Sequence, residues 1–205
     1  MLKQTTPKKE GKYISILADG LFHMTVAEGT EGAVKRDYET SDGKAGTKYE
    51  LVYGELTGKI DEVGFFDSNY GKLLQITVTD GEEEPVIISV GTSGNFGTDL
   101  LKKLPNIDLK KEVTFAPYSF KDEKTSKPKR GVTITQEGKK LESFYYDAKK
   151  KANKHDFPEI DEAKLKKQKK AYWKGYFLQV EEFLVDDITK RFDIEDNQTE
   201  EARKF

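Results

Sequence analysis

The strongest constraint on the fold is a dense β pattern between residues 48 and 147. Short runs of β-branched and aromatic residues alternate there with turn residues, and every second residue from Leu74 to Val78 is apolar. Glycines inside the long run 49–66 indicate bulges or sharp coiling, which allow a sheet to curl on itself. The pattern therefore predicts a small and strongly curved β-sheet.

Five strands and one helix are expected in this region. The strands are predicted at 49–66, 72–79, 85–90, 112–120 and 131–136, with a further strand at 140–146, and the helix is predicted at 95–104. This is the element order of the OB-fold, a five-stranded barrel with a helix between its third and fourth strands. An immunoglobulin-like sandwich would need about seven strands and no internal helix. We therefore predict a mainly β protein with an OB-fold-like five-stranded barrel at residues 49–147.

The segments on either side of the barrel have different compositions. Residues 1–48 are expected to form a flexible arm, a hairpin of strands 12–17 and 21–26 around Asp19-Gly20, and a long loop, 28–48, all packed on the barrel. After the barrel we expect a basic linker at 148–160, an amphipathic helix at 161–192 and an acidic tail at 193–205.

The predicted C-terminal helix carries one apolar stripe. Its members recur at intervals of three and four residues and are Trp173, Phe177, Val180, Leu184 and Ile188. An exposed apolar face of this size favours association. The stripe could pack on the barrel, on a second copy of the chain or on a protein partner. Because a basic linker would tether the helix loosely, we predict a partner or a second copy, and the sequence leaves packing on the barrel open.

The residues available for catalysis are few. The chain has no cysteine, and its only imidazoles are His23 and His155. The strings typical of phosphate loops, dinucleotide sites, zinc proteases and serine hydrolases do not occur. We therefore predict a non-enzymatic protein with no catalytic residues, no metal and no cofactor, in which His23 is a packed or solvent-facing side chain rather than a general base. No apolar run approaches the roughly 20 residues of a membrane helix, and we expect no membrane partner.

The net charge of −2 hides a strong asymmetry. Residues 121–174 carry 17 Lys and Arg against 9 Asp and Glu, a net charge of +8, whereas the segments before and after it are each acidic by 5. A basic block of this kind indicates a region that faces a polyanion. The alternative is a solvated surface whose charges compensate one another.

Binding single-stranded nucleic acid requires cations for the phosphates and flat side chains for the bases. Both kinds of residue gather in the two loops that OB-folds use for this purpose. The predicted nucleic-acid-binding residues are Phe65, Tyr70 and Lys72 around the first loop, and Tyr118, Phe120, Lys121, Lys124, Lys127, Lys129 and Arg130 around the second. Alternation along a strand places one of the neighbours Phe65 and Phe66 in the core.

The stretch 51–147 resembles the OB-fold single-stranded-DNA-binding proteins of tailed bacteriophages. The strings that carry the resemblance are Gly58-Lys-Ile60, Asn69-Tyr-Gly-Lys-Leu73, Ile107-Asp108, Pro117-Tyr-Ser-Phe120 and Gln136-Glu-Gly-Lys139. The resemblance implies binding of single-stranded DNA without sequence specificity, in phage DNA replication, recombination or repair, in the cytoplasm of an infected bacterial host. It also implies that the acidic tail, which ends at Phe205, contacts replication or recombination proteins.

Two other readings stay open from the sequence. The chain could be a phage structural or assembly protein whose barrel and helix are protein-interaction surfaces. The barrel could also bind RNA or a carbohydrate. The sequence leaves the choice between DNA and RNA, the site size and the oligomeric state undetermined, including whether the chain forms a homo-oligomer.

Overall fold

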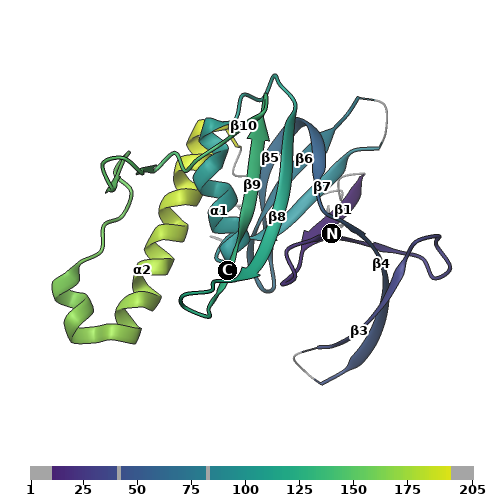
Figure 1. The fold of residues 1–205 in the computed structure, drawn as a ribbon, viewed down its shortest axis with the longest axis horizontal. Coiled ribbons are helices and arrows are strands. Elements are labelled where there is room, and N and C mark those ends of the chain that lie inside the picture. The colour runs from purple at the N-terminus through teal and green to yellow at the C-terminus, as the bar shows by residue number, and fades with distance from the viewer. Residues whose placement is uncertain (1–10, 41–42, 82–83, 195–205) are drawn as a thin grey trace, which may run out of the picture.

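The computed structural model describes residues 11–40, 43–81 and 84–194 (Figure 1). The first ten of the eleven residues of the predicted arm and most of the acidic tail, with Phe205, lie outside these residues. The chain is mainly β. Its strands are β1 (Lys12–Ile16), β2 (Phe22–Val26), β3 (Val34–Glu39), β4 (Ala45–Tyr53), β5 (Leu56–Ser68), β6 (Gly71–Thr79), β7 (Val86–Gly91), β8 (Val113–Lys121), β9 (Pro128–Gln136), β10 (Lys139–Lys140), β11 (Tyr146–Asp147) and β12 (Ala152–Asn153). The helices are α1 (Asn95–Lys103), the short 3-10 helix η1 (Leu104–Asn106) and α2 (Glu162–Arg191).

The first ten strands form one sheet in the order β10-β9-β8-β5-β6-β7-β1-β2-β4-β3. The five strands predicted for the barrel are β5 to β9, and α1 lies between β7 and β8 in the chain as expected. The prediction of a closed barrel is corrected, because pairing among the described strands leaves the sheet open. The edge of β7 that a closing strand would need is taken by β1, which pairs with it in parallel from Lys12 to Ser15.

The long strand β5 gives the sheet its curvature. Its first residues, Leu56–Gly58, pair with β8, and the residues from Lys59 to Ser68 pair with β6. The register shifts between Ile60 and Glu62, which marks a bulge just after the change of partner. The curling is strong enough that the turn between β1 and β2 reaches β8. A Cβ on Gly20, whose φ is +81°, would lie 2.3 Å from the backbone nitrogen of Ser119.

Helix α1 covers the outer edge of β9. Among the described strands, only β10 pairs with this edge, at Thr135 and Gln136. The backbone amide and carbonyl of Val132, further back in β9, are hydrogen-bonded by side chains instead. Asp99 Oδ2 accepts a hydrogen bond from the Val132 amide at 2.7 Å, and Lys103 Nζ donates to the Val132 carbonyl at 2.7 Å. The two side chains form an ion pair of 2.7 Å, in which Lys103 is buried. Side chains of α1 thus take the place of a neighbouring strand.

Helix α2 contributes to the core of its own chain. Val180 is 5% exposed, and Leu184 and Ile188 are fully buried with residues of α1 and the sheet. The prediction that these three side chains bind a partner is therefore corrected, since they have almost no surface left to offer. The predicted bounds of α1 and α2 agree with the structure to within one residue at each end.

The segment predicted as a basic linker, 148–160, is anchored rather than loose. Tyr145, just before it, is 1% exposed, and Phe157 within it is 8% exposed. The hydroxyl of Tyr145 donates to Asp187 of α2 at 2.5 Å. The His155 ring stacks on Phe144 with centroids 3.9 Å apart. These contacts fix α2 relative to the segment that precedes it, and α2 packs on α1 and η1.

The N-terminal region and the start of the predicted barrel differ from the prediction in two parts. The hairpin around Asp19-Gly20 is confirmed, because β1 and β2 pair antiparallel. The predicted loop 28–48 is wrong, since Val34–Glu39 and Ala45–Glu50 pair as the β3–β4 hairpin, which projects from the body (Figure 1). The predicted single strand 49–66 is in fact divided at Gly54-Glu55 into β4 and β5.

We expect Gly58→Ala to lower the free energy of unfolding by about 1–3 kcal/mol, as overpacking does. A Cβ at this position would lie 2.8 Å from the Thr79 carbonyl oxygen and 2.8 Å from Val78 Cγ1, at the point where β5 changes partner. Gly64→Ala is the matched control in the same strand, because its Cβ would meet nothing closer than 3.9 Å. Urea unfolding of both variants checks the expectation, and equal stabilities would contradict this account of β5.

Candidate nucleic-acid interface

The end of the β8–β9 hairpin carries an aromatic pair beside a basic loop, and we call residues 118–130 the hairpin tip. Alternation in β8 buries Phe115 and Pro117 and leaves Tyr118 and Phe120 on the other face. The rings of Tyr118 and Phe120 lie 5.7 Å apart at 32°, and Phe120 is 53% exposed. Gly131 makes room for Tyr118, since a Cβ there would lie 2.5 Å from the Tyr118 hydroxyl oxygen. Burial raises the pKa of the Tyr118 phenol.

The hairpin tip also carries five cations, three of which, Lys121, Lys124 and Lys129, line one hollow with Phe120. Lys121, Lys124 and Lys127 are exposed, and within the described residues none of their ammonium groups has an ion pair. Lys129 is paired with Asp122, and Arg130 Nε donates to Ser119 Oγ at 3.4 Å. The three unpaired lysines are therefore the cations most available to a phosphate backbone.

Asp122 organises the loop between the strands. Its Oδ1 accepts hydrogen bonds from the Lys124 amide at 3.1 Å, the Thr125 amide at 2.8 Å and the Thr125 hydroxyl at 2.8 Å. The hydrogen bond from Lys129, together with those from Thr125, holds the pKa of the Asp122 carboxyl well below its usual range. The charged form is thus the one that shapes the loop.

A shallow hollow lies beside this loop. It has a volume of about 360 Å³ and is lined by Phe120, Lys121, Asp122, Glu123, Lys124 and Lys129. Exposed ring carbon and lysine meet there on one surface, next to Asp122 and Glu123. This combination suits a base that stacks on Phe120 while its phosphate lies against a lysine.

The other predicted loop is the turn between β5 and β6. Tyr70 is 94% exposed, and Lys72 Nζ is paired with Asp67 at 2.8 Å. Phe65 is half-buried against the core, whereas its neighbour Phe66 is 46% exposed. The expectation that one ring of this pair lies in the core holds only in part, because Phe65 packs against the core without being fully buried. Phe66 offers more free ring surface than Phe65.

The two loops lie at opposite ends of the paired strands. Because β5 and β8 are antiparallel, the turn after β5 and the loop after β8 point in opposite directions along the sheet. The structure therefore does not bring Tyr70 and the hairpin tip together as one patch. A nucleic-acid strand that touched both would have to run along the surface of the sheet.

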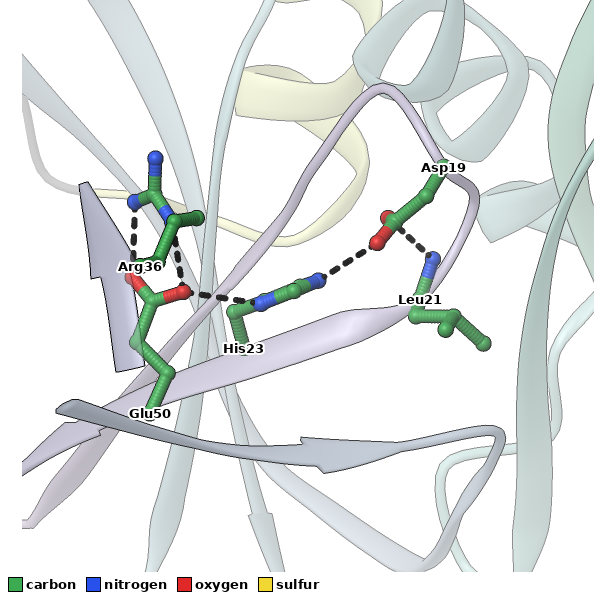
Figure 2. A network of polar contacts seen from close by, with 5 residues as sticks. All are labelled: Asp19, Leu21, His23, Arg36 and Glu50. Carbon is green, nitrogen blue, oxygen red and sulfur yellow. Dashed lines mark hydrogen bonds and ion pairs between the residues drawn. The ribbon is translucent and has the colours of Figure 1, made fainter. Parts of the chain in front are cut away.

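Figure 2 shows a polar network that joins the N-terminal strands. Arg36 binds Glu50 through two hydrogen bonds of 2.7 Å, and Glu50 Oε2 lies 3.0 Å from His23 Nδ1. His23 Nε2 lies 2.9 Å from Asp19 Oδ2, and the His23 side chain is 8% exposed. The hydrogen bond from Arg36 lowers the pKa of Glu50. The network thus links β2, β3, β4 and the Gly20 turn through the His23 side chain.

Comparison with protein-family models, with curated proteins and with solved structures finds no match for this chain. Within the described ranges, no group of three or more His, Asp or Glu residues is placed to hold a metal ion. None of the helices in the described part of the chain is long and apolar enough to cross a membrane. The geometry of the hairpin tip therefore carries the functional argument.

Sequence reasoning missed two residues that shape this site. The charge pattern does not distinguish Asp122 from other acidic residues. An Asp whose side chain binds the amides two and three residues later, here those of Lys124 and Thr125, is typical of an Asx-turn. Gly131 had no signal of its own, because its role depends on the ring of Tyr118 from the neighbouring strand.

We expect Asp122→Ala to loosen the loop without unfolding the sheet. The substitution removes the acceptor of the Lys124 and Thr125 amides, so these amides should exchange with deuterium faster. Glu123→Ala is the control of equal charge, since Glu123 is exposed and has no hydrogen bond to these amides among the described contacts. Hydrogen exchange by NMR measures both. Unchanged exchange in Asp122→Ala would remove its organising role.

Proposed function

We propose that this chain is a non-enzymatic protein that binds single-stranded DNA without sequence specificity through the hairpin tip. The observation that carries the proposal is the exposed Phe120 ring beside Tyr118, in one hairpin tip with three lysines that have no described ion pair, two of which line a hollow with Phe120. Ring faces accept any base, and flexible lysines serve chiefly as cations for the phosphates, so this set of residues favours binding without base readout.

The arrangement of the sheet supports the proposal. Strands β5 to β9 follow the order of an OB-fold, with a coiled first strand shared between two neighbours and a helix before the fourth strand. We propose that these strands are an OB-like unit whose closing edge is occupied by β1 and by the side chains of α1. In that unit the hairpin tip corresponds to the loop between the fourth and fifth strands. The resemblance to phage proteins extends the proposal to DNA replication, recombination or repair in an infected bacterial host.

Binding would proceed through two contributions. Lysines of the hairpin tip displace condensed counterions from the phosphates, which makes the affinity depend steeply on salt. Bases then stack on Phe120 and, where its ring is accessible, on Tyr118, each adding on the order of 1–3 kcal/mol. Asp122 lowers the conformational-entropy cost of binding, because its hydrogen bonds already order the loop in the free protein.

Replacing Lys121, Lys124 and Lys127 with Ala should flatten the salt dependence of binding. A single strand gives a log–log slope of about −0.7 per neutralised phosphate, so three lost contacts change the slope by about 2. Fluorescence anisotropy of labelled oligo-dT across a series of salt concentrations measures this. The control is Lys110, Lys139 and Lys140 to Ala, three exposed lysines near the opposite end of β8 and β9.

An equal change of slope in both triple variants would mean that the field of the whole protein, not the hairpin tip, attracts the DNA. No binding by the unaltered protein at low salt would overturn the proposal and favour a phage structural or assembly role.

Phe120→Ala should weaken oligo-dT binding by about 1–3 kcal/mol, because the ring is a stacking surface. The melting temperature should hardly change, since Phe120 is 53% exposed. Tyr146→Ala removes another ring of similar exposure, 43%, from the β11–β12 region and should leave the affinity unaltered. Equal affinities of the two variants would exclude stacking on Phe120.

A further inference from the structure

The first half of α2 extends beyond the core and has a distinctive composition. From 163 to 180 it contains the six lysines 164, 166, 167, 169, 170 and 174, four aromatic residues and no Asp or Glu. The helix bends at Lys169, where φ is 36° and ψ is −102°. Only from Val180 onward is its apolar face buried. The segment before Val180 therefore carries surface that the core does not use.

Two of its aromatic residues hold the segment in place. The Tyr172 hydroxyl accepts a hydrogen bond from the Asp161 amide at 2.5 Å, and the Tyr176 hydroxyl donates to the Pro158 carbonyl at 3.1 Å. Asp161 also caps the helix by accepting from the Lys164 amide at 2.9 Å. The start of α2 is thus tied back to the anchored segment that precedes it.

The other two aromatic residues, Trp173 and Phe177, are free of such bonds in the described structure. They lie one turn apart, with ring centroids 5.6 Å apart at 23°, and Phe177 is 61% exposed. Lys170 and Lys174 are exposed and share their side of the helix, because positions i, i+3, i+4 and i+7 face one way. We call Lys170, Trp173, Lys174 and Phe177 the lysine–aromatic face.

We propose that the lysine–aromatic face is a second contact for single-stranded nucleic acid, which binds the continuation of a strand held at the hairpin tip. Its parallel rings offer stacking surface, and its lysines have no ion pair within the described residues. A lysine-rich segment without acidic residues suits a polyanion. Two stacked rings beside the lysines favour a nucleic acid over an acidic protein, because bases stack on aromatic rings. Figure 1 shows this half of α2 and the β8–β9 connection in the lower part of the view, at the same end of the molecule.

This inference rests on the proposed function. It can be tested separately, because Trp173 is the only tryptophan of the chain and its fluorescence therefore reports on the lysine–aromatic face alone. The anisotropy of labelled oligo-dT reports binding anywhere on the protein, whereas quenching of tryptophan emission reports contact at the lysine–aromatic face. An oligomer of about 30 nucleotides exceeds the usual 4–16 of one OB-fold site, and one of about 8 does not. We expect the long oligomer to quench Trp173 in parallel with its anisotropy change, and to quench it more than the short one.

Lys170→Ala with Lys174→Ala should flatten the salt slope for the long oligomer by about 1.4, at 0.7 per phosphate. Lys139→Ala with Lys140→Ala is the control of equal charge. Phe177→Ala should weaken binding of the long oligomer by about 5- to 150-fold, the equivalent of one stacked base, while Leu178→Ala, also half exposed, should not.

Anisotropy binding without tryptophan quenching would overturn this inference and leave the proposed function standing. No anisotropy change with either oligomer would overturn the proposed function itself. Quenching by anionic phospholipid vesicles, with none by oligo-dT, would also overturn the inference and assign the face to a lipid surface.

Discussion

The strand β5 is the constraint on which the rest of the structure depends. It pairs with β8 through its first three residues and with β6 through the remainder, so two parts of the sheet share one coiled strand. Gly58 allows the close approach to Thr79 at the change of partner. Because β5 coils there, β8 and β9 turn toward α1, and the turn at Gly20 reaches the backbone of Ser119. The hairpin tip owes its position to this geometry.

The unclosed edges of the sheet are satisfied in two different ways. β1 adds to β7 as a parallel strand, and Asp99 with Lys103 binds the backbone of Val132 in β9. Helix α2 then covers α1 with Val180, Leu184 and Ile188. The result is a rigid base from which the β8–β9 loop and the first half of α2 extend, and both extensions are rich in lysine and aromatic residues. Functional contacts are commonly carried by such segments on a rigid scaffold.

Much of the fold follows from local patterns in the sequence. Alternation from Leu74 to Val78 predicts β6, and the helical spacing after Asn95 and after Asp161 predicts α1 and α2. The β3–β4 hairpin was missed because β3 is mostly charged and β4 begins with Ala45-Gly-Thr-Lys48, so no apolar alternation marks residues 34–48. The open sheet was missed for a different reason. Whether β1 or β9 takes the edge of β7 is decided by contacts between distant residues, such as Asp99 with Val132, which no local pattern reports.

The candidate site was predictable in its composition and not in its organisation. Tyr118, Phe120 and the following lysines stand close together in the sequence, whereas the pairing of Lys129 with Asp122 and the distance between Tyr70 and the hairpin tip emerge only in the fold. Hydrogen–deuterium exchange of the full chain, with and without an oligo-dT of about 30 nucleotides, tests the central claim most directly. The account predicts slower exchange across residues 118–130 and no change in the β3–β4 hairpin. Protection of β3 and β4 with an unaltered hairpin tip would contradict it.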